Sequence, residues 1–111
     1  MRLTGTRRSK YGARKTLVDG YLFDSGMEAR RYLDLKLLRM AGEIDLLTLQ
    51  PVFPLIVDGV AIGKYVADFS YVLTKNGELV IEDVKGFDVP LGKWKRKHCE
   101  AQYGVSIVVV R

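Results

Sequence analysis

Apolar residues follow a helical period in two parts of the chain and a strand period in most of the rest. Between Ser25 and Ala41 they recur every three or four positions, and a second helical pattern covers about residues 91–103. Elsewhere apolar residues alternate with polar ones or form short β-branched runs. The strands predicted on this basis cover residues 16–18, 21–23, 44–49, 52–57, 65–73, 79–85 and 105–110.

Turn and capping residues mark the ends of these elements. Ser25 and Glu28 form the S-x-x-E pattern of a capping box, which predicts that the first helix begins there. Gly42 and Gly104 each follow a helical pattern and suit the left-handed conformation that closes a helix. Asp-Gly and Asn-Gly pairs favour the positive φ that tight hairpin turns require. They predict turns at Asp19-Gly20, Asp58-Gly59 and Asn76-Gly77.

Together these elements predict an α+β fold, in which a mixed, mostly antiparallel central sheet is flanked by two helices. A chain of 111 residues fits one domain, which we expect to span residues 16–111. Pro51 and Pro54 favour edge or bent pairing, because proline cannot donate a hydrogen bond to a neighbouring strand. The β-branched run at 105–110 predicts a buried strand.

The net charge of +5, from 18 Lys and Arg against 13 Asp and Glu, is unevenly distributed. Residues 1–15 contain no acid and a third of the basic residues, which predicts a flexible basic arm on a nearly neutral body. A second basic cluster covers residues 93–97. Such patches suit a polyanion, most commonly nucleic acid. The alternative is a solubilising tail and a solvated helix face.

Basic side chains of the arm and of both helices are the expected contacts to nucleic-acid phosphates, which they would neutralise without reading bases. They are Arg7, Arg8, Lys10, Arg14, Lys15, Arg30, Arg31, Lys93, Lys95, Arg96 and Lys97. Trp94 lies within the last group. Its ring is able to stack on a base, but its helical spacing from Cys99 and Tyr103 favours a place in the core.

Several kinds of site are excluded by composition. A single Cys rules out an internal disulfide and a zinc site built from several cysteines. The only His is adjacent to that Cys, so on a helix the two side chains diverge by about 100° and form no catalytic pair. No apolar run approaches the roughly 20 residues of a membrane span, and the basic N-terminus lacks a signal-peptide core. We therefore expect no membrane partner and a reducing, cytoplasmic location.

Two acids and a lysine lie in strands that are otherwise apolar. If Asn76-Gly77 is a two-residue turn, Lys85 lies opposite Asp68 and Asp83 is a diagonal neighbour on the same face. Glu82 then points to the other face. A shift of one residue in the pairing would exchange the two faces.

Charges directed toward a sheet interior cost free energy unless they are paired or bound to a metal. One interpretation is a cross-strand ion pair between Asp68 and Lys85 on a solvated face. The other is a site for a hard cation, since Mg²⁺ is typically held by one or two carboxylates together with substrate phosphate. In that case Lys85 would lie where an attacking water and the phosphate charge need a cation.

Asp68 followed, after fourteen residues, by Asp83-Val84-Lys85 resembles the PD-(D/E)xK nuclease signature, with Glu28 as the acid of the first helix. Longer runs are similar to those of a small phage and prophage family of unknown function that is grouped with this superfamily. They are 15–20, 23–25, 28–32, 49–51, 67–69 and 82–86. The resemblance covers about residues 10–111. Ala67 replaces the proline of the signature, which is not a ligand.

The resemblance implies a restriction-endonuclease-like core and hydrolysis of phosphodiester bonds with Mg²⁺ or Mn²⁺. Asp68 and Asp83 would hold the metal, with the Val84 carbonyl as an extra ligand. Glu28 would complete the catalytic set as a further ligand or through a bound water; otherwise it is only a helix cap. Lys85 would orient the water and offset charge on the phosphate.

The short chain leaves no extra domain to read a long DNA sequence. Small nucleases of this superfamily in phages and archaea include Holliday-junction resolvases, which are two-fold dimers. We therefore expect a phage-encoded, homodimeric endodeoxyribonuclease that acts on branched DNA in the bacterial cytoplasm. The alternatives are a non-catalytic nucleic-acid binder and a phage assembly or host-interaction protein on a nuclease-like scaffold.

Overall fold

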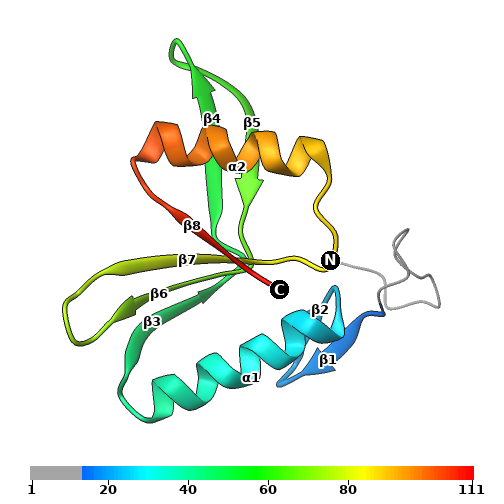
Figure 1. The fold of residues 1–111 in the computed structure, drawn as a ribbon, viewed down its shortest axis with the longest axis vertical. Coiled ribbons are helices and arrows are strands. Elements are labelled where there is room, and N and C mark those ends of the chain that lie inside the picture. Colours follow the sequence, from blue (N-terminus) through cyan, green and yellow to red (C-terminus); the bar gives the residue numbers. More distant parts are fainter. Residues whose placement is uncertain (1–13) are drawn as a thin grey trace.

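Four strands form the central sheet of the protein, in the order β3-β6-β7-β8 (Figure 1). The computed structural model describes residues 14–111. The strands are β3 (Ile44–Leu49), β6 (Phe69–Leu73), β7 (Leu79–Val84) and β8 (Ile107–Val110). β3 with β6 and β6 with β7 are antiparallel, whereas β7 with β8 is parallel. The predicted α+β class, with a mixed and mostly antiparallel sheet, is therefore confirmed.

Helix α1 (Gly26–Met40) covers one face of this sheet and begins and ends where its capping residues predict. The Ser25 hydroxyl accepts a 3.2 Å hydrogen bond from the backbone N–H of Glu28, which satisfies one of the free donors at the helix start. After the helix, Gly42 adopts a φ of 78° and turns the chain into β3. A short hairpin, β1 (Thr16–Val18) and β2 (Tyr21–Phe23), precedes the helix.

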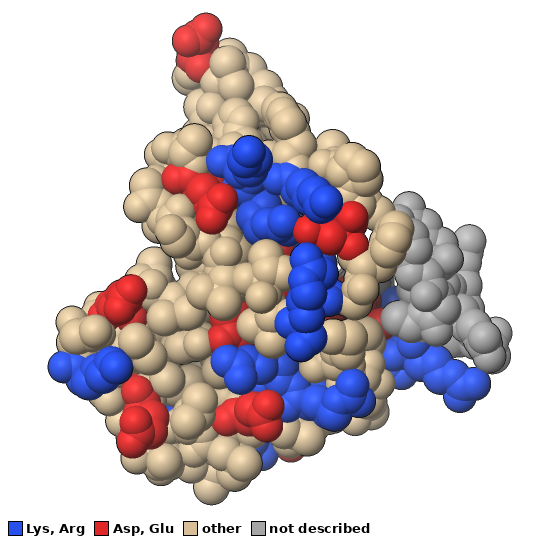
Figure 2. Space-filling model, viewed as in Figure 1, with Lys and Arg blue, Asp and Glu red and all other residues tan. Residues whose placement is uncertain are grey.

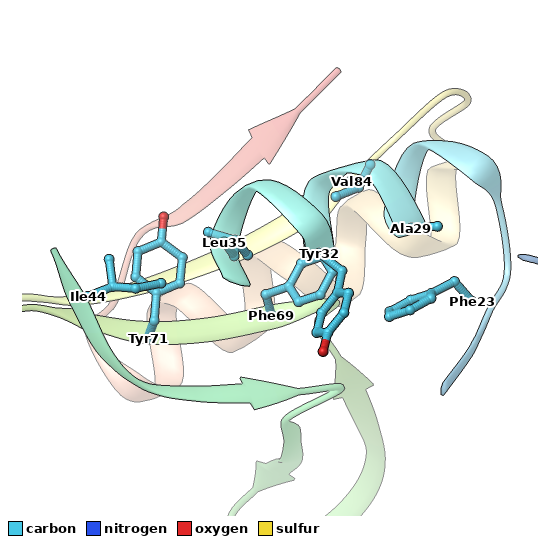
Figure 3. Packing of buried hydrophobic residues seen from close by; sticks show 8 residues of the cluster. All are labelled: Phe23, Ala29, Tyr32, Leu35, Ile44, Phe69, Tyr71 and Val84. Atoms are coloured by element: carbon cyan, nitrogen blue, oxygen red, sulfur yellow. The ribbon is translucent and has the colours of Figure 1, made fainter. Parts of the chain in front are cut away.

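The core between α1 and the sheet is a cluster of buried aromatic and aliphatic side chains (Figure 3). Its members are Phe23, Ala29, Tyr32, Leu35, Ile44, Phe69, Tyr71 and Val84. Leu35 and Tyr32 occupy the inward face of the helix. The second apolar stripe of this helix, Leu33, Leu37 and Met40, lies outward and is exposed. This core fixes α1 and β7 relative to each other.

Helix α2 (Pro90–Tyr103) lies on the opposite side of the sheet, together with a two-stranded ribbon (Figure 1). The ribbon consists of β4 (Val52–Val57) and β5 (Val60–Val66), which pair with each other. Ile81 of β7 contributes to the second core with residues of α2, β8 and the ribbon. The other members are Leu55, Tyr65, Ala67, Cys99 and Ile107.

The strand predicted over residues 65–73 is wrong, because the chain changes partner at Ala67 and Asp68. The N–H of Ala67 still donates to the Pro51 carbonyl, at 3.1 Å, in line with the ribbon. The N–H of Asp68 donates to the Glu82 carbonyl, at 3.0 Å, within the central sheet. Asp68 therefore begins the central-sheet segment and lies where ribbon and sheet separate.

The predicted two-residue turn at Asn76-Gly77 is also wrong. The N–H of Leu73 donates to the Glu78 carbonyl at 2.9 Å, so a longer connection joins β6 to β7. Phe69 consequently pairs with Glu82, not with Val84 as the predicted turn requires. The N–H of Asp68 donates to the same Glu82 carbonyl, so Asp68 does not lie opposite Lys85. The predicted register between β6 and β7 is therefore wrong by two residues. Because side chains alternate with a period of two, the predicted faces are unchanged.

β8 is shorter than predicted and forms one end of the described sheet. Ile107 is buried, but Val108 is exposed and the last two residues are partly buried, so the expectation of a buried strand is confirmed only at Ile107. No helix among residues 14–111 is long and apolar enough to cross a membrane. Arg7, Arg8 and Lys10 of the predicted basic arm lie outside the described residues.

Candidate active site

A hollow of about 440 Å³ opens where β6, β7 and the first turn of α1 meet. Four carboxylates, one amide and one ammonium group are among the side chains that line it. The lining residues are Asp24, Glu28, Gln50, Val66, Asp68, Asp83, Val84 and Lys85. Three distant parts of the sequence thus place the four predicted catalytic side chains, Glu28, Asp68, Asp83 and Lys85, around one space.

Asp68, directly before β6, and Asp83 of β7 both line this hollow. Asp83 is 2% exposed and Asp68 is partly buried. The Asp68 Oδ2 accepts a 2.6 Å hydrogen bond from the backbone N–H of Val84, which holds its carboxyl group against β7. Burial raises the pKa of Asp68, and the charge of Glu28 and a hydrogen bond to Asp83 raise it further.

Glu28 is 8% exposed and lies in the first turn of α1. Burial raises its pKa to about 7, with the nearby charge of Asp24 as the next cause. The hollow therefore contains more carboxyl groups than it readily ionises. A divalent cation placed among them would remove that cost, because opposite charge favours the ionised form.

Lys85 contacts Asp83, not Asp68. Its Nζ lies 3.2 Å from the Asp83 Oδ1. The two residues alternate along one strand and so project from the same face. The cross-strand Asp68–Lys85 ion pair, considered above, does not form, and Lys85 remains partly open to solvent at the edge of the hollow.

Tyr65 contacts the other carboxylate oxygen of Asp83. The sequence analysis did not predict Tyr65 as a site residue. Its hydroxyl donates a 2.5 Å hydrogen bond to the Asp83 Oδ2, and Arg96 of α2 lies 3.9 Å from the same oxygen. Burial, followed by this hydrogen bond, raises the pKa of Tyr65. Tyr65 comes from the ribbon, whose course beside the sheet no local pattern indicates.

Asp24 and Gln50 also line the hollow, although neither was predicted as a site residue. Both lie within the runs that carry the family resemblance, 23–25 and 49–51. That resemblance was the one feature of the sequence that could have identified them as site residues. Gln50 adopts a φ of 52°, a conformation that costs a residue with a side chain roughly 1–2 kcal/mol. Its N–H donates to the Asp68 carbonyl at 2.9 Å, which ties the end of β3 to the site.

Residues 8–109 match the model of a family described as "Protein of unknown function (DUF1064)". The chain belongs to this family. The comparison with curated proteins found no match, and neither did the comparison with solved structures. The description of the DUF1064 family names no activity.

In this DUF1064 protein, Glu82 lies next to Asp83 but faces away from the hollow. Arg31 binds its carboxylate through two hydrogen bonds, and the Tyr71 hydroxyl donates to it as well. Glu82 is therefore a structural carboxylate, as the predicted face assignment indicates. This contact occupies the Arg31 guanidinium, so Arg31 is not among the side chains proposed to contact phosphate.

Basic side chains gather over both α1 and α2 on one side of the molecule (Figure 2). Arg14, Arg30, Lys93 and Lys97 are exposed, and Lys95 is partly buried. Two further predicted contacts have carboxylate partners. They are Lys15, 3.2 Å from Asp24, and Arg96, 2.8 Å from Asp88.

The donors around the hollow fit a hydrated hard cation. No three Asp, Glu, His or Cys side chains among residues 14–111 come close enough to form a three-ligand cage. Mg²⁺ and Mn²⁺ do not need one, since Mg²⁺ keeps several waters and is usually bound by one or two carboxylates. Asp68 and Asp83 supply such a pair. The Val84 backbone and the Glu28 carboxyl group lie at the same hollow.

Proposed function

We propose that this protein is a metal-dependent endodeoxyribonuclease that hydrolyses phosphodiester bonds. The observation that carries the proposal is the convergence of the Asp68 and Asp83 side chains at one hollow, with Lys85 beside Asp83. Carboxylates and a lysine arranged in this way suit hydrolysis of a phosphate ester, in which negative charge builds up next to an attacking water.

Each residue of the site has a distinct part in this proposal. Asp68 and Asp83, with the Val84 carbonyl and Glu28, would hold Mg²⁺ or Mn²⁺, which supplies Lewis-acid chemistry when bound. Lys85 orients the water and offsets charge on the phosphate. Tyr65 holds the Asp83 carboxylate in one orientation through the Oδ2 atom. The core between α1 and the sheet keeps Glu28 at the hollow.

The substrate we propose is branched DNA. Basic residues of α1 and α2 would supply phosphate contacts, and residues 14–111 contain no element suited to reading a long sequence in the major groove. Phosphate contacts of this kind would select the shape of the DNA, and a two-fold dimer would match a two-fold junction. We propose that the protein takes part in phage DNA processing.

Cleavage of matched linear, flapped and four-way DNA tests the proposal directly. With Mg²⁺ we expect cuts in the branched substrates at lower enzyme concentration than in linear DNA, and none with excess EDTA. Equal cutting of all three substrates would remove the resolvase version. Lys85→Ala should abolish cleavage, whereas Lys75→Ala, an exposed lysine in the β6–β7 connection, is the matched control.

Titration calorimetry with Mn²⁺ separates this function from the non-catalytic alternatives. A nuclease should bind Mn²⁺ and lose that binding in Asp68→Asn. A DNA binder without a catalytic site should bind DNA with strong salt dependence, but show neither metal binding nor product. An assembly or host-interaction protein should show none of the three.

A further inference from the structure

Trp94 is the single tryptophan of the chain, and it is 54% exposed. The expectation that it packs in the core is therefore wrong. Cys99, five residues further along α2, is fully buried, which places Trp94 on the solvent side of the helix. A large indole ring that is exposed and does not pack in a core is typical of a binding surface.

The surroundings of Trp94 combine apolar and cationic groups. Leu91, one turn earlier, is 62% exposed, and the His98 ring lies 5.5 Å from the indole, centre to centre. Lys93 and Lys97 are exposed on the same side of α2 and one turn apart. Lys and Arg side chains also gather over this helix in Figure 2. We call Leu91, Lys93, Trp94 and Lys97 the aromatic–basic face.

We propose that the aromatic–basic face binds an unpaired nucleotide of the DNA substrate, with Trp94 stacked on its base. Lys93 and Lys97 neutralise the adjacent phosphates. Aromatic platforms flanked by basic side chains bind single strands in this way, because every base has a flat face for stacking. In a duplex that face is covered by the neighbouring base pairs, so the contact favours unpaired positions.

This inference deepens the proposed function and rests on it for the identity of the substrate. α2 begins at Pro90, directly after the loop that follows Lys85, so the face adjoins the proposed catalytic strand in the sequence. Branch points and flaps are where DNA offers unpaired or easily unstacked bases. The face therefore gives a physical basis for selecting branched over linear DNA.

A second copy of the chain is a less suitable occupant. In a two-fold interface the same patch occurs on both subunits, so Lys93 and Lys97 would lie close to their own copies. Like charges at short distance oppose such an association. Phosphates, in contrast, complement both lysines.

The lone tryptophan makes the inference testable without catalysis. In EDTA, where no cleavage occurs, we titrate the full chain with a single-stranded oligonucleotide and with the duplex of the same sequence. We expect the Trp94 emission to be quenched by the single strand at concentrations at which the duplex has little effect. Unchanged emission with saturating single strand would overturn the proposal, as would a change that depends on protein concentration alone.

Variants then assign the contact. By anisotropy of a labelled single strand, Trp94→Ala should weaken binding roughly 5- to 150-fold and Trp94→Phe much less, because Phe retains a stacking face. Leu37→Ala, an exposed apolar residue of α1, is the matched control and should bind as the wild type does. Equal affinity of Trp94→Ala and wild type contradicts the inference.

Failure of this inference is distinguishable from failure of the proposed function. Intact cleavage with an unquenched Trp94 would remove the aromatic–basic face and keep the nuclease. Quenching by the single strand without any cleavage under Mg²⁺ or Mn²⁺ would keep the face and remove the nuclease.

Discussion

Arg31 of α1 donates two hydrogen bonds to the Glu82 carboxylate of β7. Their lengths are 2.8 Å from Nε to Oε1 and 2.6 Å from Nη2 to Oε2. Glu82 is 1% exposed, so its carboxylate is shielded from solvent. Arg31 lies three residues after Glu28, and Glu82 directly precedes Asp83. The ion pair therefore connects the helix that carries one site acid to the strand that carries another.

Removing Arg31 should destabilise the protein strongly. Arg31→Ala leaves the buried Glu82 carboxylate without its cation, and breaking one side of such a pair costs about 3–5 kcal/mol. Urea unfolding measures the change in the free energy of unfolding. Arg30→Ala, at the exposed neighbouring position, should stay within about 0.5 kcal/mol of wild type. A loss below 1 kcal/mol in Arg31→Ala would show that the pair does not hold α1 to β7.

Tyr65 and Tyr71 give a matched pair of variants, since each hydroxyl donates to one of two adjacent carboxylates on opposite faces of β7. Tyr65→Phe should weaken Mn²⁺ binding roughly 10- to 100-fold, because it frees Asp83 to rotate. Tyr71→Phe should lower stability and leave Mn²⁺ affinity unchanged, because Glu82 faces away from the site. Calorimetry on both variants checks this, and equal effects would refute the positioning role of Tyr65.

The metal-free protein should become less stable as the pH rises. Folding raises the pKa of Glu28 from 4.5 to about 7, and it raises that of Asp68 as well. A carboxyl group whose pKa is higher in the folded chain contributes its full stability below its unfolded pKa and loses it as the pH passes the folded pKa. For Glu28 this amounts to up to about 3 kcal/mol.

Melting temperatures in EDTA from pH 5 to 9 measure this effect. They should fall most steeply around neutral pH in wild type and less in Glu28→Gln, whose amide does not ionise. Saturating Mn²⁺ should restore stability above pH 7, since it binds the ionised carboxylates of the folded chain. A pH-independent melting temperature in EDTA would contradict the crowding of acids at the hollow.

The lysines of α2 should contribute to DNA affinity without regard to sequence. Lys93→Ala and Lys97→Ala should each reduce the slope of log K against log salt by about 1, because each removes one phosphate contact. Lys64→Ala, an exposed lysine of the ribbon, should leave the slope unchanged. If all three variants have the same slope, the DNA does not contact the lysines of α2.

Local signals made much of the fold predictable from the sequence. Ser25, Gly42 and Gly104 mark helix ends through contacts within a few residues of themselves, and the structure bears out all three. The opposite faces of Asp83 and Glu82 were also predictable, because alternation along a strand survives an error of two in the register.

The remaining features depend on distant parts of the chain. The chain changes partner between Ala67 and Asp68, because the N–H of Ala67 donates to Pro51 and that of Asp68 to Glu82. No local pattern in the sequence indicates this change. Tyr65 meets Asp83 because the ribbon folds beside the sheet. Trp94 shares a helical spacing with core residues, yet it faces outward because the axis of α2 is set by packing against Leu55 and Ile81.

Cleavage of a four-way DNA junction in Mg²⁺ by Asp83→Asn tests the central claim most directly. Glu78→Gln, an exposed acid directly before the same strand, is the control. We expect wild type and the control to cut alike, and Asp83→Asn to lose roughly 100-fold or more of the rate while it remains folded. Wild-type cutting by Asp83→Asn would contradict the proposed site.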